Sequence, residues 1–513
     1  MDGLDECDDR QTLLEIFAAN VSKLPTNFRF LLTARPEDDI LQYLQGLDCV
    51  HVMRMDESTT KDVTNEDIEK FIRHKLQKVS FKLDRRWPNG SWVAKLVESS
   101  DCLFLWASTA CSFIKPSGNE ISEPAEQFDA LISDRGIIGN LNELYQKVLE
   151  HKFSNKVGYD KRLSNFKTLM KKILAARVPL SRAALDVIFN AESMSEITEK
   201  ILPHLGAFLT GTDERTAPIQ FLHFSFKEFL TDAKRGKQFF VGDAHSANHE
   251  FALASLRIMN TLKPDICSLE DHMALNPQIS DIQQCVDNWE AIVYACCFWE
   301  AHLEASDALM ADDIQSFLVE FLPVHVLHWI EALSLANQLS VASTSMDSMS
   351  AFLKLSIENW QNHLKLAGDV KRMVIAFYPL VSKHCLQIYH SAMLFTPRNT
   401  ELFKQYGRNN PLLYELLHPP SEWQALLCTM DEHTNSVTSV VFSPQGDRLA
   451  SCSRDETIRL WYSQTGKQFG EAMMGHTDSV ISVVFSPTGD TPIYTPIEKL
   501  PKSVTGPGCV KHY

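Results

Sequence analysis

The stretch His433-Thr434-Asn435-Ser436-Val437, followed by Val440-Val441-Phe442-Ser443-Pro444, decides how the C-terminal part of this chain folds. Both segments recur 43 residues further on, as His476-Thr477-Asp478-Ser479-Val480 and Val483-Val484-Phe485-Ser486-Pro487. Residues 448–453 and 457–461 alternate like strands around a short turn. A period of roughly 40–45 residues with such strands is typical of β-propeller blades. The repeat therefore predicts a partial propeller.

The composition bounds the remaining possibilities. The chain has 513 residues, which is enough for about three to four domains, and 44% of them are hydrophobic. A formal net charge of −16 argues against a nucleic-acid binder. Twelve scattered cysteines without metal spacing indicate a reducing compartment, so we expect a cytoplasmic protein. No apolar run of ~18 residues occurs, and no membrane span is expected.

The opposite end of the chain begins with the acidic run Asp2-Gly3-Leu4-Asp5-Glu6-Cys7-Asp8-Asp9. In P-loop enzymes a carboxylate after a strand holds Mg²⁺, and a later acid polarises water. Asp2 is the candidate for the metal, and Asp5 and Glu6 are the candidates for the later acids. A solvated acidic segment without a function is the alternative. No Gly-x-x-x-x-Gly-Lys-Ser/Thr loop, which would cradle the phosphates, occurs among the 513 residues.

Residues 11–24 carry apolar side chains at helical spacing, and residues 28–33 form a short apolar run between prolines. This order predicts a helix and then a buried strand of an α/β sheet. Arg35 follows the strand, at the edge where such sheets bind ligands, and could contact a γ-phosphate.

Helices are predicted for most of the middle of the chain. Residues 64–67 resemble a capping box that begins one helix, and residues 92–113 read as a single apolar helix. Residues 219–226 alternate like a strand that enters a helix. His223 lies there among apolar residues, which favours a core histidine. Residues 244–427 are nearly all helical, with a polar loop at residues 341–350.

Taken in order, five segments resemble the fungal NACHT–WD-repeat family of STAND signalling NTPases. They are residues 2–9, residues 28–36, Phe104-Leu105-Trp106-Ala107, Leu141-Asn142-Glu143-Leu144-Tyr145, and His223 with Ser225-Phe226. The resemblance implies a Walker B segment with Asp2, Asp5 and Glu6, and a sensor arginine at Arg35. It also implies that His223 contacts the β-phosphate of ADP. In that family ADP holds a closed state, and exchange for ATP opens it for assembly.

The resemblance also assigns the propeller residues. The polar network between the strands would consist of His433, Ser451 or Ser453, Asp455 and Trp461, with His476 opening the second copy. These residues are structural, not catalytic. A single blade cannot bury both of its faces, and its edge strand invites pairing with another chain.

We therefore expect a mixed, mostly α fold with a remnant of a P-loop α/β NTPase core, a winged helix, a large helical domain and partial WD-repeat blades. The predicted parts are 1–45 (end of the NTPase core), 46–135 (helical), 136–240 (winged helix), 241–427 (helical bundle or solenoid), 428–490 (propeller) and 491–513 (disordered tail).

The functional prediction is a non-catalytic protein-interaction or regulatory module derived from a truncated signalling switch. Its partners would be proteins, with self-association through the propeller edge, and no cofactor is expected; ATP or ADP with Mg²⁺ would bind only if a Walker A part were supplied. One alternative is a fragment of an ATP-dependent switch that uses Asp2, Glu6, Arg35 and His223. Another is a scaffold that binds partners through residues 244–427.

Overall fold

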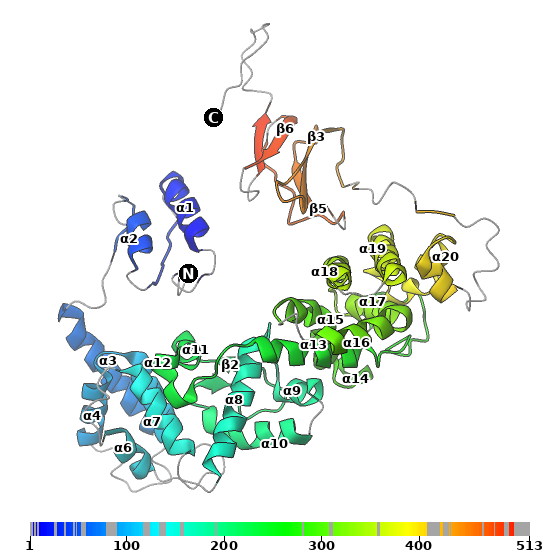
Figure 1. Ribbon diagram of the computed structural model, residues 1–513. Helices are drawn as coiled ribbons and strands as arrows, with labels where there is room; N and C mark the ends of the chain where they lie inside the picture. The colour runs from blue at the N-terminus through cyan, green and yellow to red at the C-terminus, as the bar shows by residue number, and fades with distance from the viewer. Residues whose placement is uncertain are drawn as a thin grey trace, which may run out of the picture. The chain divides into compact units, whose positions relative to one another are not determined.

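Figure 1 shows the computed structural model of the chain. It describes residues 4, 7, 10–24, 28–34, 37–44, 47, 49–52, 58–77, 90–115, 124–132, 140–153, 158–189, 192–279, 282–306, 311–355, 360–407, 421–423, 430, 432–463, 466–476, 478–486 and 492–496. The chain divides into two compact units, residues 1–115 with 123–144, and residues 116–122 with 145–513. Helices dominate both units, and the described strands form three small sheets. The mixed, mostly α fold class with strands at the C-terminal end is thereby confirmed.

The first unit begins with two short helices, α1 (Arg10–Asn20) and α2 (Asp38–Leu44). The predicted helix at residues 11–24 is confirmed as α1 with a 3-10 turn at Val21–Lys23. Leu14 is buried, and it belongs to a small cluster with two residues of α2. Arg10 holds the helices together, because its guanidinium lies 2.6 Å from Glu37 and 2.8 Å from Asp39.

The predicted buried strand at residues 28–33 is wrong. These residues form no strand, and Phe28 and Phe30 are each 53% exposed. The Leu4 N–H donates a backbone hydrogen bond to the carbonyl of Thr33, at 2.9 Å. An apolar run becomes a strand only where neighbouring strands satisfy its peptide groups. The Phe30 ring instead packs edge-on against Phe17.

Four helices complete the described part of this unit: α3 (Ser58–Gln77), α4 (Gly90–Ser100), α5 (Phe104–Ile114) and α6 (Pro124–Ile132). Two predictions are corrected here. The capping box at residues 64–67 is wrong, because α3 begins at Ser58. The single helix over residues 92–113 is wrong as well, because Asp101 and Cys102 adopt positive φ angles of 43° and 65°, which end α4. Trp92 of α4 stacks on Phe128 of α6.

The second unit, which resumes at Tyr145 within α7, begins with helices around a small sheet. The elements are α7 (Leu141–Phe153), α8 (Tyr159–Ala175), α9 (Arg182–Ile188), α10 (Glu192–Ile201), β1 (Leu209–Thr210), β2 (Gln220–Phe221), α11 (Phe224–Thr231) and α12 (Ala233–Gly236). β1 and β2 pair antiparallel, and the Ile219 N–H donates to the Leu180 carbonyl on the other side of β2. The predicted strand that enters a helix is confirmed. Assignment of this region as a winged helix stays a prediction.

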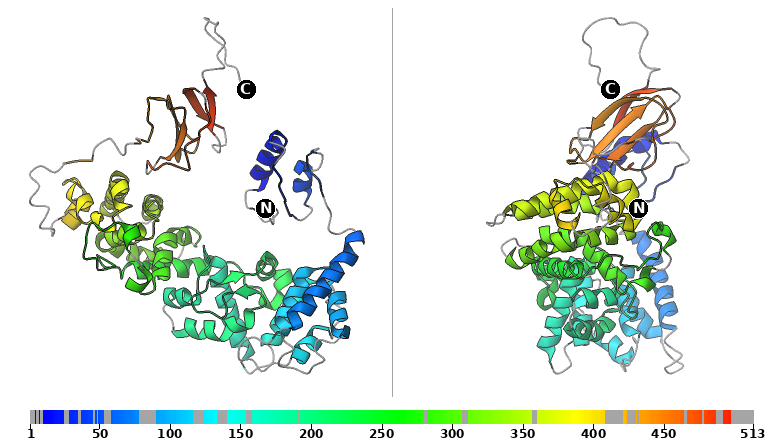
Figure 2. Two further views of the ribbon diagram at one scale, coloured as in Figure 1. Left: turned by 180° about the vertical axis from the view of Figure 1, so that it is seen from behind. Right: turned by 90° about the vertical axis from the view of Figure 1, so that its right-hand side faces the viewer.

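Helices then follow one another without a strand between them up to residue 407 among the residues described, as Figure 2 shows (green to yellow). They include α13 (His245–Met259), α14 (Ile282–Cys285), α15 (Trp289–Glu304), α16 (Ala311–Val324), α17 (Val326–Leu335), α18 (Val341–Leu355), α19 (Gln361–Val381) and α20 (Ser391–Leu394). One core runs through them, with Trp299, Phe321 and Trp329 fully buried in it.

The polar loop predicted at residues 341–350 is wrong, because these residues form most of α18. Ala342, Met346 and Met349 recur at helical spacing and are buried in the core. The hydroxyls of Ser345 and Ser348 both donate to the Glu300 carboxylate of α15. Serine favours loops when its hydroxyl bonds to nearby backbone, and here that hydroxyl is engaged across a helix interface instead.

Among the described residues, no single helix is long and apolar enough to cross a membrane. Helices α16 and α17 pass the length and composition test as a pair, but the pair is bent by 80°. Most of their apolar residues lie in the helical core just described, although Val324 is 47% exposed.

The C-terminal strands form one antiparallel sheet and one hairpin. Strands β3 (Val437–Phe442), β4 (Arg448–Ser453) and β5 (Ile458–Tyr462) lie in that order, and β6 (Val480–Phe485) pairs with β7 (Pro492–Pro496). The disordered tail predicted from residue 491 is therefore wrong for residues 492–496, because β6 offers an open edge to which an antiparallel strand can bond. The rest of that tail lies outside the described residues.

A buried histidine ties the early helices of this unit to the later ones. The His302 ring has no exposed surface, and its nitrogens bond to the Tyr294 hydroxyl (2.7 Å) and to the Asn248 Oδ1 (2.8 Å). The Tyr294 hydroxyl also accepts the N–H of Arg177. Burial, reinforced by the charge of Arg177, lowers the pKa of His302 to about 3, so the ring is neutral.

Replacement H302A should destabilise the second unit by about 2–4 kcal/mol, because it leaves a cavity and two unpaired polar groups. The loss should shrink as the pH falls from 7 to 4. The unfolded chain protonates His302 below about pH 6.5, whereas the native ring stays neutral down to about pH 3, so this residue already lowers native stability in that window. Urea unfolding read by hydrogen exchange in α13 and α15 measures both effects, with the exposed His245 (H245A) as the control. Equal losses for the two variants would contradict the assignment.

Candidate functional site

The residues predicted for nucleotide and metal binding are only partly visible. Asp2, Asp5, Glu6 and Arg35 lie outside the described residues, so their roles stay predictions. His223 is described and lies directly before α11, in the second unit. Among the residues that the structure describes, no group of three or more His, Cys, Asp or Glu side chains could hold a metal ion.

His223 is the N-cap of α11. Its backbone is extended, with φ −153° and ψ 144°, and its Nδ1 accepts the N–H of Ser225 at 3.0 Å. The Ser225 hydroxyl lies 2.8 Å from the same Nδ1 and 2.7 Å from the Tyr145 hydroxyl. The side chain is exposed, so its interpretation as a core histidine is wrong. Phe226 and Phe229 are the residues of this stretch that fill the core.

This geometry fixes the chemistry that His223 can offer. A neutral imidazole whose Nδ1 accepts a hydrogen bond carries its proton on Nε2. The ring is exposed, so this N–H is available to an acceptor from solvent. A phosphate oxygen is an acceptor of the right kind, and the first turn of a helix adds a favourable dipole for an anion.

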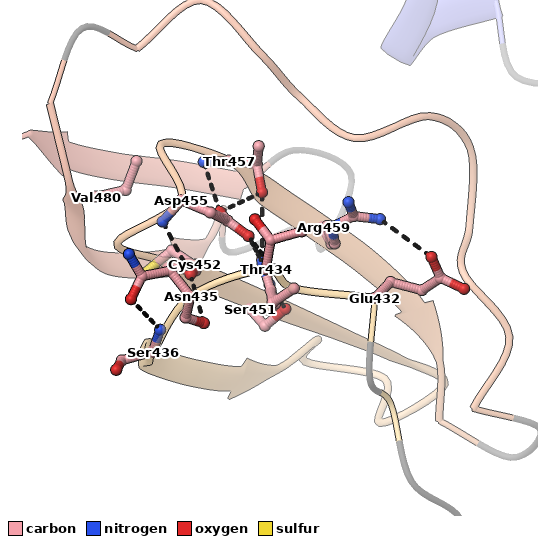
Figure 3. A network of polar contacts seen from close by, with 12 residues as sticks. Glu432, Thr434, Asn435, Ser436, Ser451, Cys452, Asp455, Thr457, Arg459 and Val480 are labelled. Atoms are coloured by element: carbon pink, nitrogen blue, oxygen red, sulfur yellow. Dashed lines mark hydrogen bonds and ion pairs between the residues drawn. The ribbon is translucent and has the colours of Figure 1, made fainter.

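The second group of candidate residues lies in the blade. His433 Nδ1 lies 2.8 Å from the Asp455 carboxylate, and both side chains are almost completely buried. The same carboxylate accepts the N–H of Thr434, and its other oxygen accepts the N–H and hydroxyl of Thr457. Figure 3 shows Asp455 pointing towards both threonines. Asp455 thus binds the turn between β4 and β5 to the segment that precedes β3.

Ser451 carries the network across the sheet. Its hydroxyl lies 2.7 Å from His433 Nε2, and it accepts the indole N–H of Trp461 at 2.7 Å. Between the two serines considered from the sequence, Ser451 is therefore the one that joins His433 and Trp461. Ser453 instead donates to the carbonyl of Asn435. The bonds form one chain that runs from Asp455 through the two ring nitrogens of His433 to Ser451 and on to Trp461.

The second copy cannot repeat this arrangement. His476 is half-buried at the position that corresponds to His433. The residues that stand at the spacing of Ser451, Asp455 and Trp461 are Tyr494, Glu498 and Val504. The second copy therefore lacks the serine, aspartate and tryptophan with which His433 forms its network.

Sequence reasoning missed Thr457, which belongs to the same network. The signal was the tripeptide Asp455-Glu456-Thr457, in which an aspartate can accept the backbone N–H two residues later. Burial alone would raise the pKa of Asp455, but bonds from Thr457, His433 and the backbone lower it well below its ordinary value. The carboxylate is therefore charged, and its role is to hold the blade rather than to exchange protons.

Replacement D455A should destabilise the blade by roughly 3 kcal/mol, because it removes several charge-assisted bonds and leaves their buried donors unpaired. In the native chain this contribution is present above the ordinary carboxyl pKa of about 3.9 and is lost as the pH falls towards the lowered one. Hydrogen exchange of peptides that cover β4 and β5 measures the effect, with E471A as an exposed control. Unchanged protection in D455A would show that the network does not stabilise the blade.

Comparison with known proteins agrees with this geometry. The family model described as "WD domain, G-beta repeat" matches residues 424–462, which contain β3, β4 and β5. Two iron-sulfur assembly proteins match over shorter stretches. They are "Probable cytosolic iron-sulfur protein assembly protein 1" of Scheffersomyces stipitis (28% identity, 24% of this chain, 34% of that protein) and Ciao1 of Culex quinquefasciatus (42%, 10% and 15%).

A third relative matches along most of the chain. It is "Vegetative incompatibility protein HET-E-1" of Podospora anserina, 26% identical over 505 residues, which cover 91% of this chain and 35% of that protein. The chain thus spans about a third of the length of this relative. Together, the extent of this match and the WD repeat confirm the resemblance of this chain to the fungal NACHT–WD-repeat family.

Proposed function

We propose that this chain acts as a protein-interaction and regulatory part of a signalling switch of the NACHT–WD-repeat type. The observation that carries the proposal is an apolar strand face on an otherwise well-built blade. Val440 and Phe442 of β3 are 58% and 60% exposed, and they alternate with Val441, which packs on the core of the blade.

Packing and hydrogen bonds hold the strands of the blade behind this face. Ala450, Cys452, Ile458 and Leu460 form a core with Val480 and Val483 of β6 on one side of the sheet. The Asp455 network fixes the turns, so β3 is held in a defined register with β4. In a propeller each blade packs both faces against neighbours, and one blade alone leaves apolar surface for another protein. A second copy of this chain is the occupant that requires no further component.

The chain should therefore self-associate with rising concentration, and V440E/F442E should shift it towards the monomer. The carboxylates would lie in the apolar face, where burial without a partner is costly. Sedimentation velocity over a concentration series measures the shift. The control is S436E/Q445E, which adds the same two negative charges at exposed positions just before and just after β3. A native chain that stays monomeric, or an equal shift in both variants, would contradict this part of the proposal.

A nucleotide-linked switch is the second candidate. His223 is exposed, and it caps α11 through Nδ1, which leaves its Nε2 side open to a phosphate oxygen. The first proposal expects no saturable binding when ADP or ATP with Mg²⁺ is titrated calorimetrically into this chain. Low-micromolar binding that weakens about tenfold or more in H223N would favour the second candidate instead. Asparagine is itself a good N-cap, so H223N removes the imidazole and keeps the start of α11.

A further inference from the structure

A shallow groove crosses the second unit beside α8. One hollow of about 320 Å³ lies between the end of α8, the segment that follows it and strand β2. A second hollow of about 540 Å³ lies between α8, α11 and residues 240–244. Leu174 and Lys227 line both hollows, so the two run end to end. Figure 1 shows α8, β2 and α11 in this part of the chain. An elongated groove of this kind suits a chain segment better than a compact ligand.

The floor of the groove is apolar. Ile173, Leu174, Pro179 and Phe221 line it, and Val178 leaves 42% of its surface exposed there. The exposed ring of Phe224 lies beside this surface, since the ammonium of Lys227, which lines both hollows, is 5.6 Å from the centre of that ring. A contiguous apolar surface with polar edges is typical of an interaction site.

The rim of the groove is basic. Lys171, Arg177 and Lys227 line it, and in the described part of the chain no carboxylate forms an ion pair with any of them. The guanidinium of Arg177 donates to the Ala301 carbonyl, which leaves its charge uncompensated. Asp243, the acid in the lining, accepts the backbone N–H of His245.

The neighbouring residue on α8 shows the contrast. Lys172 is buried, pairs with Glu250 and lies over the ring of Phe189, 3.3 Å from its centre. The charge of Lys172 therefore serves the fold. Lys171, one position earlier, points its charge to the groove without such a partner. In a chain with a net charge of −16, three uncompensated cations around an apolar floor select for an acidic partner.

We propose that this groove binds an acidic, amphipathic peptide segment of a partner protein. Its apolar side chains would fill the two hollows, and its carboxylates would pair with Lys171, Lys227 and Arg177. A nucleic acid fits less well, because three cations give little phosphate contact and the chain carries a net charge of −16. The site is separate from the β3 face, so each proposal can fail without the other.

Selection from a phage-displayed library of random dodecapeptides on the full chain tests the proposal without a known ligand. The enriched peptides should combine Asp or Glu with large apolar residues. A labelled peptide from that set should bind with micromolar affinity in fluorescence anisotropy, and its dissociation constant should rise at least tenfold in K171E/K227E. The affinity should also fall with added salt, because the ion pairs lie at an exposed rim.

The matched control is K161E/K167E, which makes the same charge change on α8 outside the groove, and its binding should stay within about twofold of the native chain. Thermal unfolding of both double variants, compared with the native chain, checks that each of them folds. Peptides without acidic residues, equal affinity of the native chain and K171E/K227E, or equal weakening in both double variants would each overturn the proposal.

Discussion

The fold of the second unit depends on one constraint: a buried polar group must receive its hydrogen bonds from segments that are far apart in the chain. Glu331 of α17 shows this clearly. Its carboxylate is buried, and it accepts the N–H groups of Asp265 and Ile266 and the hydroxyl of Tyr389. Burial raises its pKa to about 7 despite these bonds, because desolvation disfavours the charged carboxylate. The bonds hold the loop after α13 and the segment before α20 against the same helix.

Satisfied polar groups inside the protein leave specific surfaces for function. His302, Glu331 and Asp455 use their bonding capacity to hold the chain together, and none is placed to act on a substrate. The apolar face of β3 and the basic rim beside α8 have the opposite character, because their side chains lack partners of the complementary kind. This distribution supports the proposed binding role, since association is favoured where apolar surface and unpaired charge remain exposed.

Sequence reasoning succeeded where one local pattern determines the result. The 43-residue repeat predicted the strands of the blade, and helical spacing predicted α1 and the helical middle of the chain. It failed where the outcome depends on distant partners. Residues 28–33 have the composition of a strand, but in the structure they form no strand. Residues 341–350 have the composition of a polar loop, but their serine hydroxyls donate to Glu300 of a neighbouring helix. The sequence singled out His223 but placed it in the core, because an apolar neighbourhood says nothing about which side chain caps the helix.

Helix α11 carries residues of two proposed sites, the nucleotide contact at His223 and the peptide groove beside α8. His223 caps its N-terminus through Ser225, Phe226 and Phe229 anchor it in the core, and Lys227 reaches the groove from its first turn. A ligand that pulled the imidazole away from Ser225 would remove the cap, and the first turn would have to absorb the change. Lys227 lies in that turn. A phosphate contact at His223 and a peptide in the groove would therefore bias the same few residues, and thermodynamic linkage requires any such coupling to act in both directions.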